Sequence, residues 1–239
     1  NHNAVPQPED VGFDWTRHDL GVSRRMKPDR MSEFATNTIT DLYRVDADGF
    51  PRDQTTEDAI QFLSEQKEKP FFLYYATWLV HTPIQTRSKR LLKKYVEKLG
   101  VTLPKNPDQK WLQKGQTNPF YCAMVEQLDH YIGTLISHLE HTPDPRWPGH
   151  TLIENTYVIF TSDNGGMEGS SSQIITDNYP LDRGKISLME GGTRVPLIIT
   201  GPDIPRGVEL DVMVNGLDFY PTILGLTGTS PADGKHLDG

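Results

Sequence analysis

The sequence has little cysteine, no long apolar run and no excess of positive charge. Its single cysteine, Cys122, excludes an internal disulfide and a metal site built from cysteines alone. No apolar run approaches the roughly 20 residues of a membrane-spanning helix, so we expect no membrane span. The net charge of −8, from 24 basic and 32 acidic residues, argues against nucleic-acid binding, which usually leaves a basic surface.

What is present indicates a folded chain of 239 residues with one α/β region. Residues 1–54 are polar, irregular and interrupted by proline and glycine, which is typical of a segment that wraps over another part of a protein. Ordered elements are predicted from residue 55 onward. The apolar surface that residues 1–54 would cover is not evident from the sequence.

Hydrophobic periodicity predicts the elements of residues 55–239. We expect helices at 55–67, with Thr56 at its start, and at 88–99, 118–139 and 218–226; Asp218 would cap the last. Short apolar runs at 71–76, 156–161 and 195–200 predict buried strands. Alternation of helix and strand favours an α/β fold with a mostly parallel sheet flanked by helices.

Polar side chains lie beside each predicted strand, where parallel sheets place their sites. Asp163 and Asn164 directly follow the strand at 156–161, and their oxygens suit a hard cation such as Ca²⁺ or Mg²⁺. Gly165 and Gly166 would leave room for a ligand. The alternative is an ordinary Asp-Asn-Gly turn.

Two further side chains could act on an anionic substrate. Lys185, between Gly184 and a Glu-Gly-Gly turn, would offer a fixed positive charge, or would simply be solvated. His81 could protonate a leaving group, or could bond a backbone carbonyl. The tripeptide at His81 recurs at His141, which follows a predicted surface helix and is interpreted as structural.

Four blocks of the sequence, in this order, resemble type I sulfatases of the alkaline phosphatase superfamily. They are PFFLYYATWLVHTPI (70–84), VIFTSDNGG (158–166), GKISLMEGGTRVPLII (184–199) and LDFYPTILGLTG (217–228). The helix at 121–139 and the segment GFDW (12–15) are also similar to family segments. The resemblance covers nearly the whole chain and identifies residues 1–239 as part of a sulfatase catalytic domain with an alkaline-phosphatase-like fold.

The resemblance implies roles for single residues. Asp163 and Asn164 would be two ligands of a divalent cation, usually Ca²⁺ with Mg²⁺ possible. Lys185 would bind a sulfate oxygen and His81 would contact the ester near its leaving-group oxygen. Glu190 and Arg194 would form a partly buried structural pair. The substrate would be a sulfated small molecule or carbohydrate, and the location periplasmic or secreted; the oligomeric state is open.

The sequence also departs from the family. Sulfatases use a formylglycine made from the cysteine of a Cys-x-Pro-x-Arg motif, but Met124 and Glu126 stand at those positions after Cys122. We therefore expect Cys122 to be a core or groove thiol. The family's first aspartate pair and its Lys-x-His element have no counterpart, and residues 233–239 resemble the point before a C-terminal subdomain. The nucleophile region and that subdomain are thus expected to be missing.

Three functions therefore stay open. The favoured one is metal-dependent hydrolysis of a sulfate ester by a parent protein, with this chain inactive alone and binding metal weakly. A phosphonate or phosphodiester hydrolase of the same superfamily would use a similar metal site. A sulfatase-like domain with a binding or structural role would need no nucleophile.

Overall fold

The computed structural model describes residues 7–17, 34–105, 109–170, 173–232, 234 and 236–238. The chain divides into two compact units, Asn1–Pro202 and Asp203–Gly239. The second unit contains the 3-10 turn η3 (Gly216–Asp218) and helix α6 (Phe219–Thr227), close to the predicted helix at 218–226. Asp218 does not cap α6 with its side chain as predicted, because its carboxylate accepts from the Asn215 main-chain N–H instead. Residues 233, 235 and 239 of the predicted C-terminal block lie outside the described residues.

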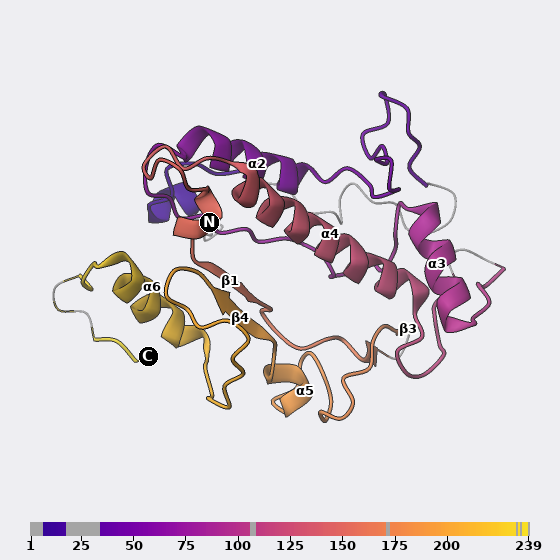
Figure 1. Ribbon diagram of the computed structural model, residues 1–239. Coiled ribbons are helices and arrows are strands. Elements are labelled where there is room, and N and C mark those ends of the chain that lie inside the picture. The colour runs from indigo at the N-terminus through magenta and orange to yellow at the C-terminus, as the bar shows by residue number, and fades with distance from the viewer. Residues whose placement is uncertain are drawn as a thin grey trace, which may run out of the picture. The chain divides into compact units, whose positions relative to one another are not determined.

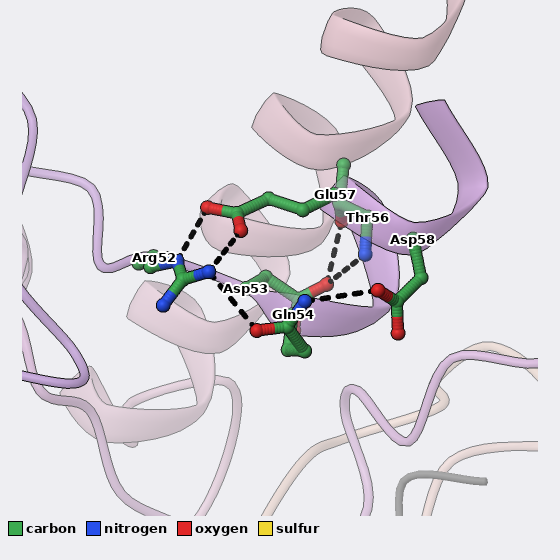
Figure 2. A network of polar contacts seen from close by, with 6 residues as sticks. All are labelled: Arg52, Asp53, Gln54, Thr56, Glu57 and Asp58. Carbon is green, nitrogen blue, oxygen red and sulfur yellow. Dashed lines mark hydrogen bonds and ion pairs between the residues drawn. The ribbon is translucent and has the colours of Figure 1, made fainter. Parts of the chain in front are cut away.

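Helix α2 (Gln54–Gln66) begins at an aspartate rather than at the predicted Thr56. The Asp53 carboxylate accepts from the backbone N–H of Thr56 at 2.8 Å and from its hydroxyl at 2.5 Å. Figure 2 shows this cap beside Arg52, whose guanidinium bonds the Glu57 carboxylate. The carboxylate satisfies N–H groups that the first turn of a helix leaves unpaired, and it favours the positive end of the helix dipole.

Replacing Asp53 by alanine is expected to lower the free energy of unfolding by about 1–2 kcal/mol, because two donors at the start of α2 lose their acceptor. Urea unfolding followed by circular dichroism measures the change. Asp53→Asn retains an acceptor oxygen and should cost much less. Equal losses for the two variants would show that the cap does not stabilise this helix.

Two further helices match their predictions. Helix α3 (Lys89–Leu99) begins after Ser88, whose hydroxyl accepts from Leu91 N–H at 3.1 Å. Helix α4 (Pro119–His141) begins after the buried Asn118, whose side-chain oxygen accepts from two N–H groups of the first turn. Each cap is a short polar side chain directly before the helix. The predictions of these helices depended on hydrophobic periodicity and did not name the caps.

Helix α4 links two hydrophobic clusters of the first unit (Figure 1). Its C-terminal half packs with α2 and the 3-10 turn η2 (Leu152–Asn155) around Leu63, Leu135 and Leu152. Its N-terminal half packs with α3 around Leu92, Phe120 and Met124. One long helix with buried residues along its whole length therefore holds both clusters together.

The segment at 7–17, which includes the short 3-10 turn η1 (Pro8–Val11), covers part of the first cluster. The ring of Trp15 lies 5.3 Å from that of Phe62 on α2, and the ring of Phe13 lies 6.2 Å from that of Phe72. Phe62 itself packs against the cluster. The apolar partner that the sequence did not reveal for the N-terminal segment is therefore the aromatic surface at α2 and Phe72.

The mixture of helices and strands agrees with the predicted α/β class, but the strand pairing differs from the prediction. Strand β1 (Val158–Thr161) pairs antiparallel with β4 (Leu197–Thr200), and the short β2 (Gly169–Ser170) pairs antiparallel with β3 (Gln173–Ile174). A parallel pair needs a long crossover connection, usually a helix. Among the described residues between β1 and β4, the only helix is the four-residue α5 (Glu190–Thr193), which is too short for such a crossover. Strand β4 therefore returns antiparallel to β1.

Residues 71–76, predicted as a buried strand, have no ladder partner among the described residues. Their burial still alternates with a period of two, as in a strand with one covered face. Phe71, Leu73 and Tyr75 pack against the first cluster, whereas Phe72 and Tyr74 are 56% and 72% exposed. The predicted alternation is therefore present without the predicted pairing. None of the described helices is long and apolar enough to cross a membrane.

Candidate functional site

The turn at residues 162–166, here called the Asp-Asn turn, carries the two predicted cation ligands at the end of β1. The Ser162 hydroxyl donates to the main-chain oxygen of Asn164 at 2.8 Å, which closes the turn. The Asn164 side-chain N–H donates to Gly165 O at 3.1 Å, so its amide oxygen is the atom left to ligate a cation. Asp163 is exposed, and within the described part of the chain its carboxylate has no ion-pair partner.

The Asp-Asn turn is bonded by its backbone to the segment that carries Lys185. Gly165 N–H donates to Gly192 O at 2.9 Å, and Lys185 N–H donates to Gly166 O at 3.0 Å. A Cβ atom on Gly165 would lie 1.8 Å from the main-chain oxygen of Gly191, closer than any real contact. Glycine is therefore required there for the two segments to approach each other, whereas the sequence suggested that it leaves room for a ligand.

Residues 183–187, here called the lysine turn, hold Lys185 between two unusual backbone conformations. Arg183 has a φ of 64° and Ile186 a φ of 75°, in the left-handed region that residues with a side chain rarely adopt. For a β-branched residue such as Ile186 this conformation costs on the order of 1–3 kcal/mol. Such outliers are retained where surrounding contacts determine the backbone, and they concentrate at functional sites.

Lys185 is half-buried, with its main-chain N–H bonded as described. Across the described residues its ammonium group forms no ion pair. A solvated lysine at the tip of a mobile loop would not be expected between two strained residues and two segment-to-segment hydrogen bonds. The backbone at Lys185 is therefore held in place, and the role of its ammonium group stays a prediction.

His81 lies in the loop after residues 71–76 and is held by Trp78. The two rings meet edge to face with centroids 4.9 Å apart, and Trp78 Nε1 donates to Thr82 O at 3.1 Å. The Nδ1 atom of His81 lies 3.2 Å from the same carbonyl oxygen. If Nδ1 donates there, Nε2 is the nitrogen that exchanges a proton with a ligand. His141 bonds the Ser137 carbonyl within α4 in the same way, so a contact to a backbone carbonyl, the alternative given for His81, does not separate the two histidines.

The structure brings together three of the four predicted site residues. Asp163, Asn164 and Lys185 lie in two segments joined by backbone hydrogen bonds. No hydrogen bond or ring contact among the described residues joins His81 to them. An open hollow of about 620 Å³ lies elsewhere, along α2 and α4, and its lining contains none of the four. It is apart from the predicted chemistry, so we give it no role in the site.

The Sulfatase family model matches residues 2–229. The chain belongs to the sulfatase family. It is 37% identical over 166 residues to a sulfatase of Formosa agariphila, an alignment that covers 67% of this chain and 26% of the relative. It is 30% identical over 186 residues to the N-acetylgalactosamine-6-sulfatase of Canis lupus familiaris, covering 77% and 30%. Arylsulfatase K of Xenopus laevis is 30% identical over 201 residues, covering 71% and 34%.

A solved structure agrees with the family. It is a Bacteroides thetaiotaomicron protein labelled "6S-sulf" and described with the metabolism of multiple glycosaminoglycans. Its TM-score with this chain is 0.53 at 25% identity, over 75% of this chain and 33% of that one. The fold is therefore that of part of a sulfatase, as predicted. The chain spans about a third or less of the length of these relatives.

Two other predictions on sulfatase motif residues have different outcomes. Glu190 and Arg194 do pair, at 3.5 Å across one turn of α5, but both side chains are 65% exposed rather than partly buried. With two buried glycines between them, α5 turns its glycines inward and its charged ends outward. Cys122 is half-buried on α4, as expected for a groove thiol, and burial raises its pKa.

The donor set of the Asp-Asn turn fits a hard cation only in part. A carboxylate and an amide oxygen are suitable ligands, but Ca²⁺ takes six to eight oxygens. No group of three or more histidine, cysteine, aspartate or glutamate side chains in the described ranges could hold a metal ion. A cation bound by Asp163 and Asn164 would therefore need further ligands from outside this turn.

Proposed function

We propose that this chain supplies part of the active site of a sulfuric ester hydrolase, with Lys185 as the anion-binding cation and Asp163 and Asn164 as metal ligands. One observation carries the proposal: the Asp-Asn turn and the lysine turn are bonded to each other through their backbones at the end of β1. Membership of the sulfatase family supports the reaction class.

The reaction breaks the bond between sulfur and the oxygen of an alcohol, and water supplies the new oxygen on sulfur. The Lys185 ammonium would pair with a non-bridging sulfate oxygen, where negative charge is held throughout the reaction. His81 would give a proton to the departing alcohol oxygen through Nε2, with the imidazole held by Trp78. A metal ion, Ca²⁺ or Mg²⁺, would add positive charge at the sulfate, and a formylglycine would supply the nucleophilic oxygen when present.

The proposed substrate is a sulfated carbohydrate. Relatives with substrates in their names act on a sulfated N-acetylgalactosamine, and the similar solved structure is described with glycosaminoglycans. Residues 167–183 begin next to the Asp-Asn turn and end at the lysine turn, so this segment would set substrate choice. Their residue Tyr179 is 86% exposed, an aromatic face of the kind that can stack on a sugar ring. A location outside the cytoplasm, periplasmic or secreted, suits such a substrate.

An assay of aryl ester hydrolysis tests the function. We expect the parent protein that contains this chain, here called the native protein, to hydrolyse 4-methylumbelliferyl sulfate and to lose turnover when EDTA removes divalent cations. The 239-residue chain by itself should show none, because it offers two cation ligands and no cysteine in a Cys-x-Pro-x-Arg motif. Preference of the native protein for a phosphonate or phosphodiester would overturn the assignment, and turnover by the chain alone would show that it holds the complete site rather than part of it.

A further inference from the structure

The side chain of Asn178 connects both turns of the site. Its amide nitrogen donates to Gly166 O at 2.9 Å and to Arg183 O at 3.1 Å. Gly166 ends the Asp-Asn turn and Arg183 begins the lysine turn. We propose that Asn178 is the positioning residue that holds the backbone of Lys185 close to the proposed cation ligands Asp163 and Asn164. This proposal rests on the function given above.

One of the two hydrogen bonds of Asn178 ends on the oxygen atom that also accepts from Lys185. Gly166 O accepts from the Asn178 amide and from the Lys185 main-chain N–H at 3.0 Å. One carbonyl oxygen therefore receives a bond from the positioning side chain and one from the residue that is positioned. A shift of Asn178 would move this oxygen, and with it the backbone of Lys185.

The two neighbouring glycines leave space for this amide and for little else. A Cβ on Gly184 would lie 2.6 Å from the Asn178 amide nitrogen, and a Cβ on Gly166 would lie 2.9 Å from its amide oxygen. The amide is thus enclosed on both sides by backbone. Its placement is tight enough to fix the separation of the two turns.

The strained conformation of the lysine turn requires such a restraint. Ile186 has a φ of 75°, yet its side chain is 90% exposed, so its own packing does not hold the backbone in that conformation. Three hydrogen bonds act on the backbone of the turn: from Asn178 to Arg183 O, from Lys185 to Gly166 O and from Ser187 to Gly184 O. Asn178 supplies the one side-chain bond among these three.

Asn178 is itself attached to the body of the first unit. The residue before it, Asp177, donates its N–H to Gln116 Oε1 at 3.0 Å, and Thr176 donates its hydroxyl to the same atom at 2.6 Å. Thr176 and its neighbour Ile175 are buried, and Ile175 belongs to the second cluster. The position of Lys185 is therefore set through Asn178 from the hydrophobic core.

The test compares Asn178→Ala with Asn178→Asp in the native protein. Alanine removes the donor, and aspartate keeps the shape but places acceptor oxygens against two carbonyl oxygens. We expect kcat/KM for 4-methylumbelliferyl sulfate to fall about 10- to 100-fold in the alanine variant, because a small displacement of a catalytic group lowers the rate by about this factor. The aspartate variant should lose at least as much. Inhibition by inorganic sulfate should weaken in parallel, and hydrogen exchange at the Lys185 amide should accelerate.

Asn155→Ala is the matched control, because it deletes an asparagine amide that bonds the Asp144 carboxylate at 3.1 Å, away from both turns. It should retain wild-type kcat/KM. If the alanine variant at 178 does not fold, Asn178→Ser, which keeps a hydroxyl donor, should show the same changes in smaller measure.

Each remaining outcome separates the two proposals. Unchanged exchange at the Lys185 amide in Asn178→Ala would overturn the positioning role, and so would faster exchange with wild-type kcat/KM and sulfate inhibition. If the wild-type native protein hydrolyses no sulfate ester, but exchange at the Lys185 amide is faster in Asn178→Ala, the connection between the turns is supported and the proposed function is overturned.

Discussion

Replacing Gly165 by alanine in the native protein is expected to remove sulfatase activity and to destabilise the fold. The added methyl would lie 1.8 Å from Gly191 O and 2.7 Å from Gly191 C, both backbone atoms that cannot rotate away. The two segments must separate, at a cost of about 1–3 kcal/mol or more. A displacement near 1 Å at Lys185 should lower kcat/KM by roughly 100-fold. Guanidinium unfolding and aryl sulfate kinetics measure the two effects.

Gly133→Ala is the matched control for this substitution. Gly133 lies on the exposed side of α4, and no heavy atom lies within 4 Å of the position its Cβ would take. Because alanine is the better residue inside a helix, the variant should be more stable by about 0.5–1 kcal/mol and fully active. A Gly165→Ala protein that matched it in activity would show that the approach of the two turns is not needed for catalysis.

Replacing Lys185 by alanine should lower kcat/KM for an aryl sulfate by about 100- to 1,000-fold, the range for losing one fixed group that stabilises transition-state charge. The half-buried side chain forms no ion pair with the described residues, so its removal should leave the melting temperature nearly unchanged. Steady-state kinetics and thermal unfolding of the native protein together check this expectation.

Lys93→Ala provides the comparison, since the Lys93 side chain is 76% exposed on α3 and lies 3.8 Å from Glu97. Loss of this surface pair should change neither activity nor stability measurably. Lys185→Arg keeps the charge but places a longer planar group in the turn, so it should recover only part of the activity. Wild-type kinetics in Lys185→Ala would remove the lysine from the mechanism.

Local patterns predicted the helices well. The apolar residues of α4 recur at three- and four-residue steps, and the capping residues Ser88 and Asn118 precede their helices by one position. Thr56 was the wrong start of α2, because Asp53, three residues earlier, accepts from the backbone N–H of Thr56 itself and so places Thr56 inside the first turn. Such choices between nearby polar residues shift a helix boundary without changing the helix.

Strand direction and the support of the site could not be predicted in the same way. Apolar runs such as 156–161 predicted buried strands, but β1 is only half-buried, and its partner depends on how the distant segment at 197–200 returns. Asn178 gave no signal either, because its contacts to Gly166 and Arg183 depend on a loop folding back on itself. Trp78 was likewise not singled out, although its ring contacts that of His81.

The side chain of Asn118 bonds two separate parts of the chain, the first turn of α4 and Ile174. Its oxygen begins α4, while its amide nitrogen donates to Ile174 O at 3.1 Å, where Trp111 O also accepts from Ile174 N–H at 2.7 Å. The stretch between this point and the lysine turn is thus fixed at Ile174 and again at Asn178. Redesign of the proposed sugar preference should consequently concentrate on residues 179–182, between Asn178 and Arg183, because exchanges near Ile174 would also disturb the start of the longest described helix.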